Sequence, residues 1–491
     1  RVKTAVPHYQ HALRLQPGWA DAHWNLGTTL FELGELPESR RHLQQALKLD
    51  PTHQEIHVTL GHVALADGDV PQAAQHYRQS LDAKSNRLLA ELRISSLAEP
   101  IPPDEQYIDD YQRRLLERLQ HAAAASPAWQ LEDLQSSGAE PPMALAYQGR
   151  NVRPILEAHA ALFSRQIEPG EPVRNRGRPR IGIVVTHGHE GVFARCWGGI
   201  AERLSRQRFD VRLVCSRSGA NVLKQMIRIA DDEYLVMPEK LVDTVEALRG
   251  ARFDLLHYWE VGTDNANYLL PFFQPARLQT NAGGWPVTSG HARSTHFVSW
   301  RLLEPPGAAA HYSEQLVTLD RLPMYYERPA PSAWRRSRET WGISADAHFY
   351  LCTQNLRKYH PQFDAILADL LRRDERGRLG IIADSQAGVT RRLQERWRRV
   401  MPDVCDRIQV LPRLERADYL QIITAADVVL DTLPYGGGVN TVCDAMAVGT
   451  PMVSLPGEFQ RSRWMTAVAS LLGVSDTIVA SPAEYVERAW R

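Results

Sequence analysis

The segment DVVLDTLPYGGGVNTVCD, residues 427–444, carries the pattern that decides the fold. An apolar run ends at Asp431, three glycines follow at 436–438, and a helical pattern begins directly after them. Successive glycines let backbone N–H groups approach an anion, and a helix N-terminus adds unpaired donors and the positive end of a dipole. The segment therefore predicts a strand, a loop that can hold a diphosphate, and a helix. Its spacing fits neither a Walker loop nor GxGxxG, which disfavours an ATPase or an NAD-binding protein.

Thr441 and Asp444 support a second interpretation of the same helix start. Their T-x-x-D spacing is that of a capping box, which satisfies a helix N-terminus without any ligand. The two interpretations are compatible, because a capped helix start can also bind an anion. Asp444, one helical turn in, could equally accept hydrogen bonds from ribose hydroxyls.

Short apolar runs alternate with helical patterns from Pro179 onward. Continuous apolar runs of this length are typical of buried parallel strands. The first series has helices expected over 193–207 and around 222–231, and strands expected at 180–187, 211–216 and 253–259. The strands of the second series are expected at 348–354, 380–384, 407–412, 427–432 and 451–456. Two such series predict two facing Rossmann-like domains, with a ligand in the cleft at the carboxyl ends of the strands.

The N-terminal part contains an internal repeat of 34 residues. ALRLQP at 12–17 returns as ALKLDP at 46–51, and Gly27 returns at the same offset as Gly61. Small residues let paired helices pack closely, and proline ends one helix before the next begins, so this pattern is the tetratricopeptide signature. The alternative is two unrelated amphipathic helix pairs. The native array is expected to extend upstream of Arg1, and the C-terminus is expected to be truncated as well.

The expected domain boundaries lie where these patterns change. The repeat period is lost after about residue 88, and a loop-rich stretch with helices expected at 109–125 and 153–166 follows. We therefore expect tetratricopeptide repeats over 1–88, a helical connector over 89–178, and Rossmann-like domains over 179–340 and 341–491.

Composition disfavours several classes of protein. Lys plus Arg and Asp plus Glu both number 57, so the chain has no net charge and lacks the field of a nucleic-acid binder. The five cysteines are scattered and never form CxxC, which is typical of reduced thiols in a cytosolic protein without a zinc site. No apolar run approaches the roughly 18 residues that span a bilayer, and no signal peptide opens the sequence. We therefore expect a cytoplasmic protein without a membrane span.

Several segments resemble the O-linked N-acetylglucosamine transferase/SPINDLY family, glycosyltransferase family 41. They are GGGVNTVCDAMAVGTPMVSLPGE (436–458), CTQNLRKYHPQFDAIL (352–367), LPRLERADYLQIITAADVVLDTLPYGG (411–437), GGWPVTSG (283–290) and LAYQGRN (145–151). The resemblance covers nearly the whole chain in the right order. It implies an α/α tetratricopeptide superhelix followed by an α/β GT-B fold, in which 179–340 faces the acceptor and 341–491 binds the nucleotide sugar.

The same resemblance implies a donor site. Lys358 would place its ammonium against the β-phosphate, with Gln354 beside it. The loop and the first turn of the following helix would contact the diphosphate through Gly437, Gly438, Asn440 and Thr441. Asp444 would hold the ribose, and backbone groups around Arg413 and Leu414 would read the base.

Three features depart from the family. Gln354 and Lys358 are four residues apart, where the family spaces this pair by three. Val439 and Tyr419 stand where the well-known members have histidines. The donor pocket is therefore altered, which leaves the base and the sugar open, and SPINDLY-type members already differ by using a fucose donor.

A general base is expected in THGHEG, residues 186–191, where the family places a histidine after the first strand. His189 is the first candidate and His187 the second, because an imidazole with a pKa near 6.5 can take a hydroxyl proton at neutral pH. The alternative is a histidine that only closes the strand by bonding to the backbone. His257 and Glu260 are further candidates in the same cleft.

Together these features predict an inverting glycosyltransferase. It would move a sugar from a nucleotide-diphosphate donor, with a UDP-sugar favoured, to a Ser/Thr hydroxyl of a protein or peptide held in the repeat groove. No metal or other cofactor is expected, because Lys358 and helix dipoles would stabilise the leaving diphosphate. Alternatives within this class are an Asn, glycan or small-molecule acceptor, or a GDP-fucose donor. The competing class is a non-catalytic repeat scaffold with a degenerate transferase domain.

Overall fold

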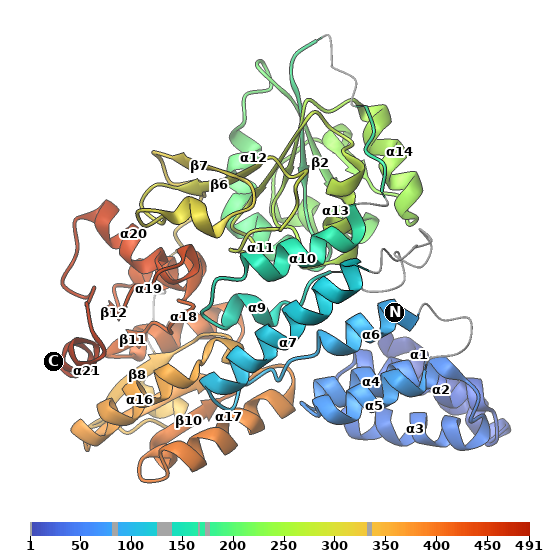
Figure 1. Cartoon of the computed structure of the whole chain (residues 1–491). Coiled ribbons are helices and arrows are strands. Elements are labelled where there is room, and N and C mark those ends of the chain that lie inside the picture. Colours follow the sequence, from blue (N-terminus) through green and yellow to red (C-terminus); the bar gives the residue numbers. More distant parts are fainter. Residues whose placement is uncertain (1, 81–86, 125–139, 165–166, 172–176, 331–335) are drawn as a thin grey trace.

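The chain folds into a helical array, a connector and two α/β halves (Figure 1). The computed structural model describes residues 2–80, 87–124, 140–164, 167–171, 177–330 and 336–491. None of the helices in these described parts combines the length and the apolar character that crossing a bilayer requires.

The array consists of antiparallel helix pairs, which confirms the tetratricopeptide prediction. A Cβ atom on Gly27 would lie 2.6 Å from Cγ of Leu43, and one on Gly61 would lie 2.5 Å from Cε1 of Tyr77, so each helix pair packs where only glycine fits. The helices are α1 (Val2–Leu15), α2 (Ala20–Glu32), α3 (Leu36–Leu49), α4 (Gln54–Ala66), α5 (Val70–Gln79) and α6 (Arg87–Ser95).

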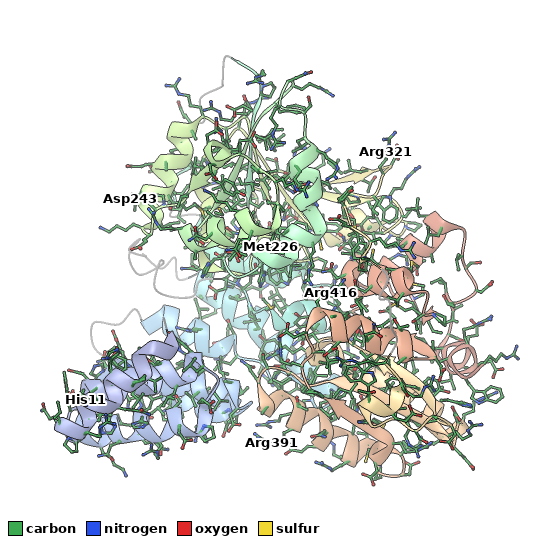
Figure 2. All side chains as sticks on the ribbon, turned by 180° about the vertical axis from the view of Figure 1, so that it is seen from behind. His11, Met226, Asp243, Arg321, Arg391 and Arg416 are labelled. Atoms are coloured by element: carbon green, nitrogen blue, oxygen red, sulfur yellow. The ribbon has the colours of Figure 1, made fainter. Side chains whose placement is uncertain are left out.

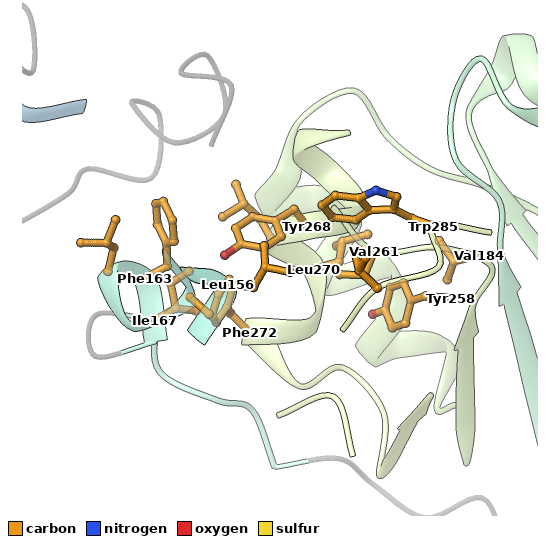
Figure 3. Packing of buried hydrophobic residues seen from close by; sticks show 14 of the residues in the cluster. Leu156, Phe163, Ile167, Val184, Tyr258, Val261, Tyr268, Leu270, Phe272 and Trp285 are labelled. Atoms are coloured by element: carbon orange, nitrogen blue, oxygen red, sulfur yellow. The ribbon is translucent and has the colours of Figure 1, made fainter. Parts of the chain in front are cut away.

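The connector joins the array to both α/β halves. Its helices are α7 (Glu105–Ala124), α9 (Ala144–Tyr147) and α10 (Arg153–Ser164). The helix expected at 109 thus begins four residues earlier, and part of the helix expected over 153–166 lies outside the described residues. Figure 3 shows Phe163 and Ile167 facing Tyr268 and Phe272, and these side chains form one buried cluster. The connector is therefore part of the core of the first α/β half.

The first α/β half contains a seven-stranded sheet of order β3-β2-β1-β4-β5-β6-β7, in which all pairs are parallel. The order reverses between β1 and β4, the kind of place where parallel sheets bind ligands. The strands are β1 (Arg180–Val184), β2 (Asp210–Cys215), β3 (Tyr234–Val236), β4 (Leu255–Tyr258), β5 (Leu278–Ala282), β6 (His296–Trp300) and β7 (Gln315–Leu319). Three of these seven strands were expected from the sequence.

The helices of this half differ in detail from those expected. In place of one helix over 193–207, α11 (Glu190–Phe193), a π-helical turn (Ala194–Gly198) and α12 (Gly199–Arg203) follow β1. The helix expected around 222–231 is α13 (Arg217–Met226), which begins earlier because the hydroxyl of Ser216 accepts a hydrogen bond from the Gly219 N–H. The half also contains α14 (Leu241–Ala251) and α15 (Asn265–Leu269).

The second α/β half contains the five expected strands in a parallel sheet of order β10-β9-β8-β11-β12. They are β8 (His348–Cys352), β9 (Gly377–Ile382), β10 (Ile408–Leu411), β11 (Val428–Leu430) and β12 (Met452–Val453). The helices are α16 (Pro361–Arg373), α17 (Ala387–Val400), α18 (Arg416–Ala425), α19 (Gly438–Val448), α20 (Trp464–Leu472) and α21 (Pro482–Trp490). The predicted fold class, a tetratricopeptide array followed by two Rossmann-like sheets, is confirmed.

The repeat array also contacts the second α/β half. Arg391 on α17 donates to the carboxylate of Asp67 in the turn between α4 and α5 at 3.1 Å, and Arg391 lies at the edge nearest the array (Figure 2). A Cβ atom on Gly388 would lie 2.1 Å from the Asp67 carbonyl oxygen, so the two backbones touch. The repeat array is therefore in direct contact with α17 of the second α/β half.

Candidate active site

A cavity lies between the two α/β halves, at the carboxyl ends of their strands. The first half contributes residues after β1, β4 and β5, which include Val192, Cys196, Trp197, Trp259 and Gly283. The second half contributes residues after β8 and β11, which include Lys358, Tyr435, Gly438, Val439 and Asn440. Most of these lining side chains are apolar or aromatic, and Lys358 is the lysine among them. The cavity thus has the location and the character of a ligand site in a two-domain α/β protein.

The glycine loop presents fewer free N–H groups than its sequence predicts. The Gly437 N–H donates to Oδ1 of Asp431 at 2.5 Å, and the Gly436 N–H donates to the Arg461 carbonyl oxygen at 3.0 Å. The N–H of Gly437 is therefore not free to face an anion, although Gly437 itself lines the cavity. The first turn of α19 begins at Gly438, and its N–H groups have no intrahelical acceptors. An anion in the cavity would meet the N–H groups of Gly438, Val439 and Asn440.

The capping-box interpretation of Thr441 and Asp444 is also wrong. The N-cap of α19 is Gly437, and no side chain caps the helix. Asp444 lies inside the helix, where its carboxylate is buried, pairs with the guanidinium of Arg416 (Figure 2) at 2.5 and 2.6 Å, and accepts from the Tyr326 hydroxyl at 2.5 Å. A ribose bound to Asp444 would have to share the carboxylate with these two partners.

Lys358 and Gln354 meet beside the loop despite their unusual spacing. Nζ of Lys358 donates to Oε1 of Gln354 at 3.2 Å and to the Gly436 carbonyl oxygen at 2.9 Å, and lies 4.3 Å from the centre of the Tyr435 ring. Burial lowers the pKa of the Lys358 ammonium to about 8, against the opposite effect of the Asp431 carboxylate. Gln354 is only 4% exposed, and its Nε2 has no hydrogen-bond partner. A buried donor without a partner among the described residues is costly, and this amide lies next to Lys358, which lines the cavity.

The other residues of the predicted sugar-donor site lie in different environments. Val439 lines the cavity and packs against the first α/β half, and Asn440 accepts from the Cys196 thiol at 3.3 Å. Thr441 is buried. Arg413 and Leu414 follow β10 outside the lining of this cavity, with Arg413 exposed and Leu414 packed on the core.

The two candidate bases are separated. Nδ1 of His189 lies 2.5 Å from Oε1 of Glu260, a carboxylate buried beside Trp259. The hydrogen bond to Glu260 raises the pKa of His189, against the effect of burial. His187 is exposed, lies 3.2 Å from the Ser216 hydroxyl, and lines a separate groove near the ends of β2 and β3. His189 is therefore the histidine whose ring is held by a buried carboxylate.

His257 has a structural position below the cavity. Its ring stacks on that of Trp197 with centroids 4.5 Å apart, and its Nδ1 lies 2.8 Å from the Thr280 hydroxyl. Burial lowers the pKa of His257 to about 4, so the ring is neutral near pH 7. Glu260 is buried as well, and its carboxylate contacts Nδ1 of His189.

Three residues of the site were not singled out from the sequence. Tyr435 and Trp197 line the cavity, and Asp431 lies buried beneath the glycine loop. Asp431 had a recognisable signal, since a carboxylate at the end of a buried strand directly precedes the glycines. Trp197 had none, because the π-helical turn that carries it interrupts a pattern that predicts one regular helix.

Comparison with known proteins agrees with these features. Residues 329–491 match the family model of glycosyl transferase family 41, and residues 19–86 match a tetratricopeptide repeat model. The probable UDP-N-acetylglucosamine–peptide N-acetylglucosaminyltransferase SEC of Arabidopsis thaliana is 25% identical over 334 residues, which cover 65% of this chain and 34% of that protein. The corresponding SPINDLY protein of Solanum lycopersicum is 24% identical over 220 residues, 44% of this chain and 23% of that protein.

A solved structure supports the fold. A mutant of the Thermobaculum terrenum O-GlcNAc transferase matches 100% of this chain and 86% of its own with a TM-score of 0.66, at 20% sequence identity. The chain spans about a third or less of the length of the two plant relatives. The resemblance to the O-linked N-acetylglucosamine transferase/SPINDLY family is confirmed: residues 19–86 are similar to tetratricopeptide repeats, and residues 329–491 are similar to glycosyl transferase family 41.

Proposed function

We propose that the chain is an inverting glycosyltransferase that moves a sugar from a nucleotide-diphosphate donor to a Ser or Thr hydroxyl of a protein or peptide. One observation carries the proposal: the Lys358 ammonium lies beside the glycine loop and the first turn of α19, and both line a cavity between two Rossmann-like sheets. A diphosphate is an anion that can accept from the ammonium and from the helix N-terminus at once.

The diphosphate would be stabilised as it leaves. Negative charge develops on the departing phosphate oxygen when the bond to the anomeric carbon breaks. The Lys358 ammonium and the N-terminus of α19 would meet that charge with positive potential in a partly desolvated site. The proposal needs no metal ion, because these groups supply the neutralising charge.

The acceptor hydroxyl would be activated by His189. Glu260 holds Nδ1, which leaves Nε2 of His189 to take the hydroxyl proton. The acceptor oxygen bonds to the anomeric carbon on the face opposite the diphosphate, the carbon–oxygen bond to the diphosphate breaks, and the configuration inverts. His187, which is exposed and lacks a buried carboxylate at hydrogen-bond distance, is the weaker candidate.

The donor and acceptor classes rest on the relatives and the architecture. Two plant relatives are named as probable UDP-N-acetylglucosamine–peptide transferases, which favours a UDP-sugar and a polypeptide. Tetratricopeptide arrays form extended concave surfaces that suit a polypeptide partner. Val439 in the cavity lining keeps the sugar itself open.

A thermal-shift panel of UDP- and GDP-sugars, followed by mass spectrometry of peptide mixtures, tests the proposal. One donor at about 100 times its dissociation constant should stabilise the protein by roughly 2.7 kcal/mol. The same donor should add its sugar to Ser or Thr side chains. Lys224→Ala is the control, because Lys224 is a partly exposed lysine paired with Asp231, and this variant should behave as the wild type. If no nucleotide sugar binds or is turned over, the chain is a repeat scaffold.

A further inference from the structure

Asp431 occupies an unusual position at the end of β11. Its carboxylate is 2% exposed and lies under the glycine loop, where Oδ1 accepts from the Gly437 N–H at 2.5 Å and Oδ2 accepts from the Ser454 hydroxyl at 2.6 Å. Its carbonyl oxygen accepts from the Tyr485 hydroxyl at 2.8 Å. Backbone and side chain are thus both fixed, so the residue is held rigidly below the loop.

This carboxylate forms no ion pair with an arginine or lysine of the described residues. Among the ion pairs formed within the described parts of the chain, none involves Asp431, and the cation that acts on it through space is Lys358. Lys358 in turn has no carboxylate in contact and bonds to the neutral oxygens of Gln354 and Gly436. The negative charge of Asp431 and the positive charge of Lys358 therefore face each other across the glycine loop.

A neutral side chain could satisfy the same hydrogen bonds. The oxygen of an asparagine could accept from the Gly437 N–H, and its NH₂ group could donate to the Ser454 hydroxyl. Burying a carboxylate is much more costly than burying an amide unless the charge is compensated. The charge of a carboxylate at this position therefore indicates compensation by the Lys358 ammonium on the other side of the glycine loop.

We propose that Asp431 is a positioning residue of the donor site: it holds the glycine loop so that the first turn of α19 faces the cavity, and its charge keeps the Lys358 ammonium protonated. The proposal rests on the proposed function only in that the cavity binds a diphosphate. The Asp431 carboxylate itself faces the loop and is separated from any ligand by Gly437.

The loop geometry supports the first part of this role. The bond from Gly437 to Asp431 removes one N–H from the cavity and anchors the residue directly before α19. A Cβ atom on Gly437 would lie 2.8 Å from Nε2 of Gln354 and 3.1 Å from Oδ1 of Asp431, so this residue fits between the two side chains only as glycine. The anchored loop therefore sets both the start of the helix and the place of the free Gln354 donor.

The electrostatics support the second part. Burial raises the pKa of Asp431 to about 6, although the hydrogen bonds from Ser454 and Gly437 and the charge of Lys358 lower it. Burial lowers the pKa of Lys358 to about 8, and the Asp431 charge opposes this effect. Between these two values both groups are charged, so removing the carboxylate would bring the loss of the lysine proton closer to neutral pH.

Asp431→Asn and Ser454→Ala form a matched pair of variants. Both change one partner beneath the loop, but only the first removes the charge. The pKa of Lys358 is read from its rate of acylation by acetic anhydride at pH 6.5 to 9.5, measured by mass spectrometry. Calorimetric titration with UDP at pH 7 and pH 8.5 gives a second readout that does not depend on sugar transfer.

We expect Asp431→Asn to move the acylation midpoint of Lys358 to lower pH and to weaken UDP binding more at pH 8.5 than at pH 7. Ser454→Ala should leave the midpoint near that of the wild type. An unchanged midpoint in a folded Asp431→Asn protein overturns the proposal. If the wild type binds no UDP but the midpoint still moves, the proposed function is wrong while the link between the two residues holds.

The reciprocal variant Lys358→Met covers the case in which Asp431→Asn does not fold. Removing the lysine charge should raise the pKa of Asp431 above its value in the wild type. This pKa is measured from the pH dependence of the Asp431 carboxyl resonance in protein labelled with ¹³C at aspartate. The same carboxyl pKa in both proteins would overturn the proposal.

Discussion

Nζ of Lys358 lies 2.9 Å from the carbonyl oxygen of Gly436, so a lysine after β8 is held on the glycine loop that follows β11. The two residues are 78 positions apart in sequence, and the adjacent strands β8 and β11 bring them together. A cation, a loop and a helix N-terminus thus share one wall of the cavity between the sheets.

Lys358→Ala should abolish most sugar transfer. Loss of one group that stabilises developing charge typically costs about 10²–10³ in kcat, and the cavity lining offers no other lysine to replace it. Initial rates of peptide modification by mass spectrometry check this, with Lys224→Ala as the control. Equal rates for the wild type and the Lys358→Ala protein would contradict the role of this lysine.

The rate of transfer should depend on pH as a bell. His189 must be neutral to accept a proton, and its pKa is raised by Glu260, so activity should rise as pH increases through a value above 6.5. Lys358 must be charged, and its pKa is about 8, so activity should fall above that pH. In Glu260→Gln the acidic limb should move to lower pH, since the carboxylate that raises the pKa of His189 is gone. A profile with the acidic limb unmoved would show that another group is the base.

The contact between the repeats and α17 should affect the modification of protein acceptors but not the binding of nucleotides. Gly388→Val would place atoms into the Asp67 backbone, because even a Cβ at this position would lie 2.1 Å from its carbonyl oxygen. We expect weaker modification of whole proteins with unchanged UDP affinity, measured by mass spectrometry and calorimetry. Gly250→Ala, where a Cβ would have open space, is the control. A fall in UDP affinity in Gly388→Val alone would place the effect in the donor site instead.

The repeat array should lose stability in mild acid. Nδ1 of His23 lies 2.9 Å from Nδ1 of His42, while Arg41 donates to Nε2 of His42 and His23 donates to the Pro17 carbonyl oxygen. Nε2 of His42 accepts in this chain of hydrogen bonds, which requires the His42 ring to be neutral. The next repeat contains an equivalent pair, His57 and His76, at 3.3 Å.

Burial lowers the pKa of His42, and together with the charges of Arg41 and His23 it brings this pKa from an ordinary value of 6.5 to about 4. The unfolded chain therefore binds this proton more readily, so the stabilisation is complete above pH 6.5 and is lost as pH falls from 6.5 towards 4. Thermal unfolding followed by circular dichroism should show a lower Tm at pH 5 than at pH 7. The drop should shrink in His42→Gln. An equal drop in the variant would assign the acid sensitivity to other groups.

Chelation should leave the enzyme active. The proposed site neutralises the diphosphate with Lys358 and the start of α19, so dialysis against EDTA should change the rate of transfer by less than twofold. A loss of activity restored by Mg²⁺ or Mn²⁺ would show that a metal ion binds the donor.

The sequence predicts the second α/β half better than the first for a physical reason. Its five strands are largely apolar, with exceptions such as Arg378 in β9 and Gln409 in β10, and apolar runs are typical of buried parallel strands. Strand β5 was missed because Gln279 and Asn281 point into the core, where their amides donate to the Pro271 carbonyl oxygen and the Glu314 carboxylate. Such a strand resembles a polar loop until its distant partners are known.

Site residues divide in the same way. The start of α19 was recognisable because local sequence fixes its chemistry, and Lys358 was predicted from the family resemblance of its segment. The order of preference between His189 and His187 depends on Glu260, 71 residues after His189, and the loss of the Gly437 N–H to Asp431 depends on how the loop folds back over its own strand. Both are tertiary contacts, which spacing along the chain does not determine.

Calorimetric titration of the wild type and the Lys358→Ala variant with UDP and with uridine tests the central claim, that this cavity holds a nucleotide diphosphate, most directly. The wild type should bind UDP much more tightly than uridine, because Lys358 and the first turn of α19 act on the diphosphate, and most of that difference should disappear in the variant. Equal affinities for UDP and uridine in the wild type, or no binding of either, would contradict it.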